Sequence, residues 1–163
     1  MDFTSLLLFM EMLSYLVTVI GLPLAIYTFA TERRKERAND EEEIYLDLAE
    51  AYNHFLILAL DNSDLQLLRR QKLQPTLDLE QSERRFALFG ILVSLFERAY
   101  ILTYEENMDR EARRRWMSWD DYMREWCRRP EFRDELPDLL WGEDNAFCQY
   151  ISRVAEEEKA SSL

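Results

Sequence analysis

The chain has 163 residues, with 32 Asp and Glu against 20 Lys and Arg, and only three Gly. A formal net charge of −12 argues against a nucleic-acid-binding protein, because such proteins need a basic surface to displace counterions from phosphates. The scarcity of Gly and of β-branched residues favours helices over β-sheet.

Residues 5–30, SLLLFMEMLSYLVTVIGLPLAIYTFA, contain a single charged side chain, Glu11. Residues 12–30 contain none over 19 consecutive positions. About 20 mostly apolar residues cross the hydrocarbon core of a bilayer as a helix, so the sequence predicts a transmembrane helix over residues 5–30. Residues 1–4 then form a short extracytoplasmic N-terminus.

The distribution of basic residues predicts the orientation of this helix. No Lys or Arg precedes it, whereas a cleavable signal peptide begins with a basic region. Arg33, Arg34, Lys35 and Arg37 follow it directly. By the positive-inside rule the N-terminus lies outside and the C-terminal part lies in the cytoplasm. We expect these four residues to contact anionic headgroups or an acidic partner.

Three residues of the predicted span are candidate contacts with a membrane partner: Glu11, Gly21 and Pro23. Glu11 lies either at the outer interface or inside the apolar layer, where a carboxyl group usually has a partner. Pro23 lacks an amide hydrogen and crowds the carbonyl of Val19, which predicts a kink.

The rest of the chain predicts a cytoplasmic helical domain. Residues 31–43 read as a charged juxtamembrane helix, residues 44–157 as the domain, and residues 158–163 as a polar tail. Apolar periodicity predicts its helices at residues 44–60, 82–106, 109–127 and 143–157. We expect Ser82 to cap the second of these helices. The fold class is therefore all-α: one N-terminal transmembrane helix followed by a bundle of about four helices with short helical connectors.

Two of the connectors hold proline. Residues 71–80, which include Pro75, read as a connection. Pro130 is expected to end the helix before it, and Pro137 to interrupt or restart a short helix that begins at Glu131.

The helix at residues 109–127 carries two patterns of interest. Its aromatic stripe is expected in the core or at an interface, rather than around a cofactor, and consists of Trp116, Trp119, Tyr122 and Trp126. Its first turns hold Arg113, Arg114 and Arg115, and Arg128 and Arg129 follow the helix. These arginines form either a solvated face with internal ion pairs or a surface for headgroups or an acidic partner.

The search for chemistry finds no catalytic or metal-binding constellation. Glu50 and His54 share a helix face, but His54 is the only histidine and a metal site needs three or four ligands. Glu97, beside Arg98, is expected in an ion pair within the bundle rather than as a catalytic carboxylate. Cys127 and Cys148 read as reduced thiols. The sequence therefore predicts no cofactor, no metal and no enzymatic activity.

Several residues, taken in order, resemble a loose set of small bacterial single-pass membrane proteins. After the N-terminal span these are Tyr52 and Phe55, Phe96-Glu97-x-x-Tyr100, Trp116-x-x-Trp119-x-x-Tyr122, Pro130-x-Phe132-Arg133, and Phe147 with Tyr150. The resemblance covers most of the chain. It implies a bacterial inner-membrane protein with a cytoplasmic helical domain, and it transfers no catalytic residue.

These expectations favour a non-catalytic accessory or scaffolding subunit whose partners are the lipid bilayer and other membrane-protein subunits, without nucleic acid. A redox, photosynthetic or transport complex is a natural host for such a subunit. The main alternative is a homo-oligomeric pore or signalling cluster in which Glu11 faces its own copies. A minor alternative is a carboxylate-based enzyme using Glu50, His54 or Glu97.

Overall fold

The computed structural model describes the backbone of residues 3–68 and 76–161, and these two ranges contain helices and turns without a β-strand. The chain divides into two compact units, Met1–Ile44 (unit 1) and Tyr45–Leu163 (unit 2). The predicted all-α class and the helical bundle are confirmed. Residues 71–75 of the expected connection, with Pro75, lie outside the described residues.

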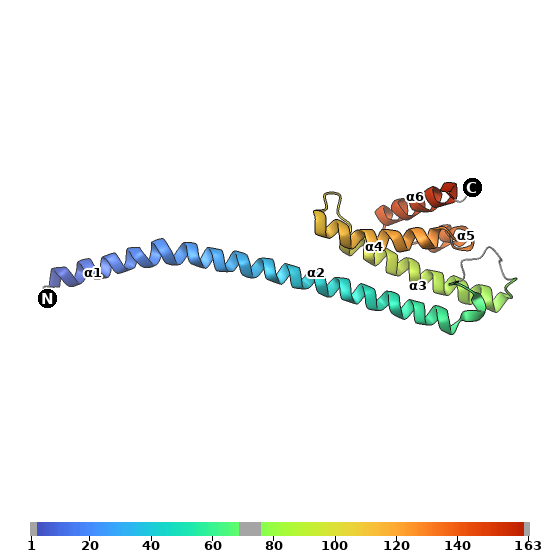
Figure 1. Ribbon diagram of the computed structural model, residues 1–163, viewed down its shortest axis with the longest axis horizontal. Helices are drawn as coiled ribbons and strands as arrows, with labels where there is room; N and C mark the ends of the chain where they lie inside the picture. The colour runs from blue at the N-terminus through green and yellow to red at the C-terminus, as the bar shows by residue number, and fades with distance from the viewer. Residues whose placement is uncertain (1–2, 69–75, 162–163) are drawn as a thin grey trace. The chain divides into compact units, whose positions relative to one another are not determined.

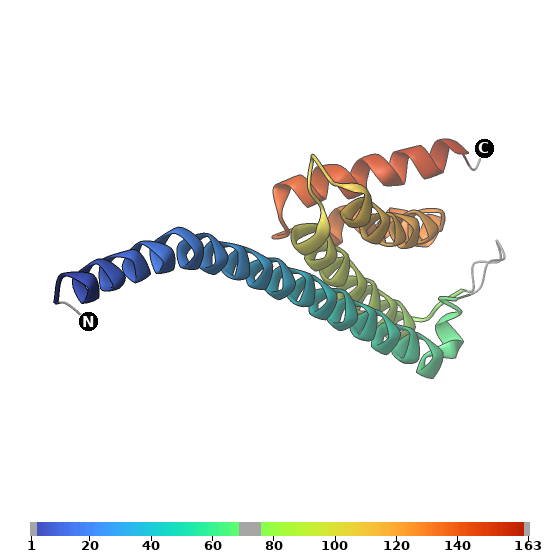
Figure 2. The same cartoon turned by 60° about the vertical axis from the view of Figure 1, so that its left-hand side comes forward.

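Unit 1 is one helical rod with an irregular turn in it. It consists of α1 (Phe3–Leu16), the π-helical turn η1 (Val17–Gly21) and the beginning of α2 (Leu22–Asp61). The π-helical turn comes directly before Pro23, whose ring excludes the regular hydrogen bond to the Val19 carbonyl. The predicted kink is present in this form, and the ribbon changes direction there (Figures 1 and 2). The residues predicted to span the membrane, 5–30, are thus shared among α1, η1 and the start of α2.

Among the described helices, α3 (Leu79–Thr103) is the one that is long and apolar enough by itself to cross a membrane, and it lies in the middle of the chain. Its apolar character has a cause within unit 2. Leu92, Val93 and Phe96 are fully buried, and α3 packs against α4, α5 and α6. We therefore assign α3 to the core of the bundle. The apolar run at the N-terminus is shared among α1, η1 and α2, so none of these elements alone holds a full span.

The helix ends in unit 2 follow capping chemistry. The Asp78 carboxylate accepts from the Gln81 amide at 2.8 Å, while the Gln81 side chain accepts from the Asp78 amide at 3.1 Å. This capping box starts α3 at Leu79, so the expectation that Ser82 is the cap is wrong. Asp109 caps α4 (Arg110–Cys127) in a similar way, by accepting from the Glu111 and Ala112 amides.

The last two helices differ from expectation at their ends. Pro130 occupies the first position of α5 (Pro130–Leu139), where its missing N–H costs nothing, so it begins a helix. Pro137 lies inside α5 near its C-terminus and neither interrupts nor restarts it. The last helix, α6 (Asn145–Ser161), continues past residue 157, because Glu158 is buried against α4.

Aromatic side chains from four helices form the centre of unit 2. Trp126 of α4 lies edge-on to Phe55 of α2 at 5.4 Å and to Phe89 of α3 at 6.1 Å between ring centroids. Phe132 of α5 contacts Phe89 at 5.1 Å. Both views show the C-terminal part of α2 alongside α3, joined through the short 3₁₀ turn η2 (Ser63–Leu65) and the segment after it (Figures 1 and 2).

Candidate functional site

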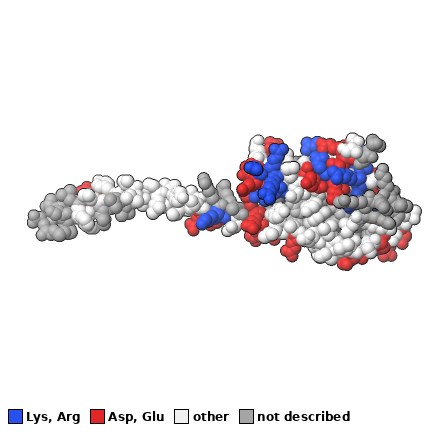
Figure 3. Space-filling view, viewed as in Figure 1, with Lys and Arg blue, Asp and Glu red and all other residues white. Residues whose placement is uncertain are grey.

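The first candidate surface is the uncharged part of unit 1, residues 12–30, which we call the apolar rod. Its described side chains are solvent-exposed; Val19, for example, is 70 % exposed and Ile26 61 %. Soluble proteins rarely leave so many large apolar side chains uncovered in one stretch. In Figure 3 this rod is white between Glu11 and the charges that follow residue 31, apart from the grey atoms.

Two hydroxyl groups of unit 1 form hydrogen bonds to the backbone of their own helix. The Thr28 hydroxyl donates to the Ala25 carbonyl at 3.0 Å, and the Thr31 hydroxyl donates to the Thr28 carbonyl at 2.8 Å. Side chains that bond back to their own helix leave no donor that needs water. The surface of residues 12–30 is therefore suited to an apolar environment.

The predicted membrane contacts occupy different elements of unit 1. Glu11 is exposed on α1. Gly21 ends η1 and is half-buried, and Pro23 is the second residue of α2. The π-helical turn changes the angular relation between the faces before and after it, so Glu11 cannot be placed on the face of Gly21 by regular α-helical spacing.

The basic residues after the apolar run all lie on α2. The Arg33 guanidinium lies 5.0 Å from the centroid of the Phe29 ring, in a cation–π geometry, and Lys35 is exposed. The side chains of Arg34 and Arg37 lie outside the described part of the chain.

The aromatic stripe of α4 lies mostly in the core of unit 2. Trp116, Trp119 and Trp126 are at most 5 % exposed, whereas Tyr122 is 38 % exposed. Tyr122 stacks on Tyr52 of α2 at 4.5 Å between centroids. The three tryptophans are thus packing residues, and Tyr122 is the member of the stripe that borders the surface.

The arginines of α4 do not form a single cluster. Arg113, Arg114 and Arg115 lie in its first turns, while Arg128 and Arg129 follow its last residue, roughly 20 Å away at the rise of an α-helix. Arg128 pairs with Glu158 at 2.7 Å, and Arg129 lies 3.8 Å from the Trp126 ring centroid and donates to the Leu67 carbonyl. Arg128 and Arg129 therefore make contacts within unit 2, although the Arg128 side chain remains 62 % exposed. In the first group, Arg113 and Arg114 are exposed and Arg115 is half-buried.

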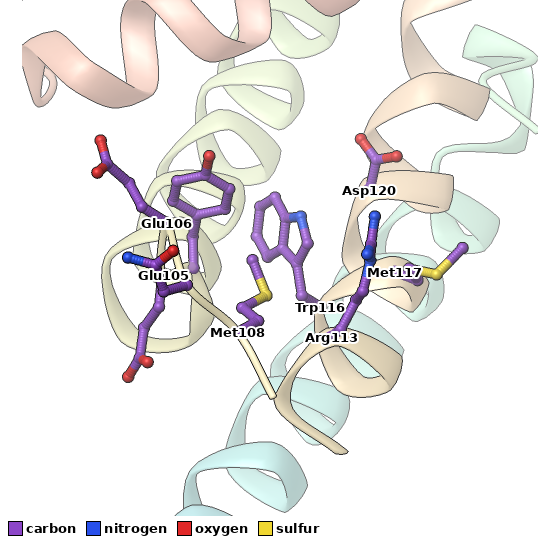
Figure 4. A pocket seen from close by; sticks show the side chains of 9 residues that line it. Glu105, Glu106, Met108, Arg113, Trp116, Met117 and Asp120 are labelled. Carbon is purple, nitrogen blue, oxygen red and sulfur yellow. The ribbon is translucent and has the colours of Figure 1, made fainter. Parts of the chain in front are cut away.

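The second candidate surface is an open pocket of about 460 Å³ between the end of α3 and the start of α4. Its lining combines aromatic, thioether and charged side chains from Tyr104, Glu105, Glu106, Asn107, Met108, Arg113, Trp116, Met117 and Asp120. Figure 4 shows Glu105 and Glu106 on one side, Arg113 and Asp120 on the other, and Met108 and Trp116 between them. Asp120 is already bonded to Arg124 at 2.9 Å and to the Tyr150 hydroxyl. This lining suits contact with a mixed apolar and polar surface.

Glu97 is engaged differently from the expected ion pair. It accepts from the Asp144 amide at 2.5 Å and is hydrogen-bonded to the carboxyl group of Glu143. This hydrogen bond, with desolvation as a second cause, raises the pKa of Glu143 to about 7. Among the described residues, these contacts with Asp144 and Glu143 take the place of the expected ion pair of Glu97.

The other residues considered for catalysis or metal binding do not form a site among the described residues. Glu50 and His54 are exposed on α2, and the described residues contain no group of three potential metal ligands. Cys127 is a buried free thiol whose pKa is raised to about 12 by desolvation, and Cys148 is a half-buried free thiol.

One exposed apolar residue of unit 2 stands out. Trp141, in the turn between α5 and α6, is 92 % exposed. It precedes Gly142, whose φ of 96° turns the chain in a conformation that favours glycine. In the sequence, the Trp-Gly pair is the feature that could indicate this exposure, because glycine favours a turn and residues in turns lie at the surface. Exposed tryptophans are enriched among the residues that dominate protein interfaces.

Comparison with known proteins gives no family for this chain: no family model, no curated protein and no solved structure matches it.

Proposed function

We propose that the chain is a single-pass membrane protein that acts as a non-catalytic accessory or scaffolding subunit. Residues 5–30 span the inner membrane with the N-terminus outside, and unit 2 docks on a larger membrane complex from the cytoplasmic side. The partners are the bilayer and other membrane-protein subunits. The observation that carries this proposal is the exposed, uncharged rod at residues 12–30.

The physical argument compares the two apolar helices of the chain. Within unit 2, one face of α3 is buried against three other helices, so burial accounts for that face, although Ile91, Ile101 and Leu102 remain about half exposed. The apolar side chains of residues 12–30 have no such cover among the described residues, and the Thr28 and Thr31 hydroxyls bond to the backbone of their own helix. A bilayer satisfies both conditions, because it covers apolar side chains and offers no hydrogen-bond partner.

The docking surface on unit 2 is proposed to include Trp141 and the α3–α4 pocket. An indole that is 92 % exposed can insert into a partner without rearranging the bundle. The acidic side of the pocket, at Glu105 and Glu106, and the basic side, at Arg113, offer polar contacts around it.

The experiment is purification of the tagged full chain from its native membrane in mild detergent, followed by measurement of the mass and composition of the particle. We expect other subunits in a fixed ratio. Trp141→Ala is expected to reduce their recovery at least about tenfold, as for an interface hot spot. Ile101→Ala is the matched control, because Ile101 is also exposed, at 57 %, and does not line the pocket. A particle that contains only this chain contradicts the accessory role.

A further inference from the structure

The outward face of α2 in unit 2 is apolar and uncovered among the described residues. Leu46, Ile57 and Leu60 are 59 %, 54 % and 61 % exposed. The other face of the same helix is buried in the bundle through Leu48 and Phe55. This part of α2 is therefore apolar on two faces, although packing of unit 2 uses only one of them.

The side of α2 that includes this face has the spacing of a coiled coil, formed by three exposed residues and two half-buried ones, Ala49 and Leu56. Leu46, Ala49, Asn53, Leu56 and Leu60 follow one another at intervals of three, four, three and four residues. These are the a and d positions of two heptads, with Asn53 at the central a position. A single Asn among apolar a positions fixes the register and the number of strands in coiled coils, because it pairs with its own copy.

The charges beside this face are compatible with a second copy in parallel. Residues 45–60 contain no Lys or Arg, and Glu50 is the acidic residue at a flanking e position. In a parallel, in-register pair an e position meets the g position of the other helix, which here is Tyr45. No like charges meet across the seam, and Asn53 meets Asn53.

From these observations we infer that the α2 seam, defined as Leu46, Ala49, Asn53, Leu56 and Leu60, binds the same seam of a second copy as a parallel coiled-coil pair. The parallel orientation rests on the proposed membrane span, which gives every copy the same direction. The exposed area of a few side chains falls short of the roughly 800 Å² per partner of a stable interface. The pair therefore depends on confinement in the bilayer, which raises the effective concentration of one copy near another.

The test is disulfide crosslinking of the full chain in its native membrane. In a background with Cys127→Ala and Cys148→Ser, single cysteines are placed at three a positions by Leu46→Cys, Asn53→Cys and Leu60→Cys. The matched controls, Asp47→Cys, His54→Cys and Asp61→Cys, are also exposed and lie one residue further on. After mild oxidation, we expect at least about fivefold more disulfide-linked dimer at the a positions, because one residue turns a side chain by about 100°.

Each other outcome overturns the inference. Equal crosslinking at a positions and controls indicates random collision. Crosslinking at Asn53 alone indicates an antiparallel pair, since only the centre then meets its own copy. No crosslinking indicates that the face does not bind a second copy. A second background that keeps the buried Cys127 and replaces only Cys148 guards against loss of folding in the cysteine-free chain.

The same membranes separate this inference from the proposed function. If the chain stays in the membrane after an alkaline carbonate wash but forms no dimer, only the seam is refuted. If the wash releases the chain, the span itself is refuted.

Discussion

At the scale of single residues, two tryptophans show how one residue type takes opposite roles in this chain. Trp126 is 1 % exposed, lies among Phe55, Phe89 and Phe132, and donates to the Tyr52 hydroxyl at 3.2 Å. Trp141 is 92 % exposed. The helical periodicity of α4 predicts the first as a packing residue, but no periodicity applies to a residue in a turn.

Replacing Trp126 is therefore expected to destabilise unit 2 far more than replacing Trp141. Trp126→Ala removes a buried ring and leaves a cavity, which lowers the free energy of unfolding by about 3–5 kcal/mol. Trp141→Ala should change it by less than about 0.5 kcal/mol, as for most surface positions. Denaturant unfolding of the purified protein measures both. Similar losses for the two variants would contradict the burial described for Trp126.

The carboxyl pair Glu97–Glu143 predicts a pH dependence of stability. The pKa of Glu143 is raised from 4.5 to about 7 in the folded protein, mainly by its hydrogen bond to Glu97. Between these values the folded state binds more protons at this site than the unfolded state. The stabilisation is therefore complete below pH 4.5 and is lost as the pH rises through 7.

The variant Glu143→Gln isolates this effect, because an amide can donate to Glu97 at every pH. We expect the melting temperature of the parent protein to fall between pH 5 and pH 8, and that of the variant to fall less. Glu156→Gln, at an exposed position of α6, is the control and should follow the parent. An identical decline in the parent and in Glu143→Gln would contradict the raised pKa of Glu143.

At the scale of secondary-structure elements, the sequence predicted which helices exist better than it predicted their ends. Apolar periodicity located α3, α4 and α6 because each buries a stripe of side chains in one core. Asp78 and Ser82 are both capping residue types, and only the reciprocal bonds with Gln81 decide between them. The hydrogen bond between Glu97 and Glu143 could not be predicted from local sequence either, since the two residues lie far apart in the chain.

The cap of α3 gives a prediction at this scale. Asp78→Ala removes the acceptor for the Gln81 amide and is expected to lower the free energy of unfolding by about 1 kcal/mol. Ser82→Ala, inside the helix, should change it by less than about 0.5 kcal/mol. Chemical denaturation of the two variants provides the measurement. A larger loss for Ser82→Ala would return the start of the helix to Ser82.

At the scale of the whole molecule, the chain separates apolar surface from charge. Unit 1 exposes its apolar side chains over residues 12–30, whereas on the face of unit 2 drawn in Figure 3 the visible Lys and Arg lie among Asp and Glu side chains. The order of these segments could be predicted from the sequence, because hydropathy and charge runs are local properties. The π-helical turn could not be located in the same way, since Pro23 predicts an irregularity but not its hydrogen-bonding pattern.

The membrane span is the central claim, and extraction of native membranes with alkaline carbonate tests it most directly. We expect the full chain to stay in the membrane pellet. The double variant Ile20→Arg with Leu24→Arg should move to the supernatant, because each arginine near the helix centre costs about 2.5–3.5 kcal/mol of insertion. Leu46→Arg with Leu60→Arg, which changes equally exposed leucines of unit 2, should remain in the pellet. Release of the unaltered chain by carbonate would contradict the account.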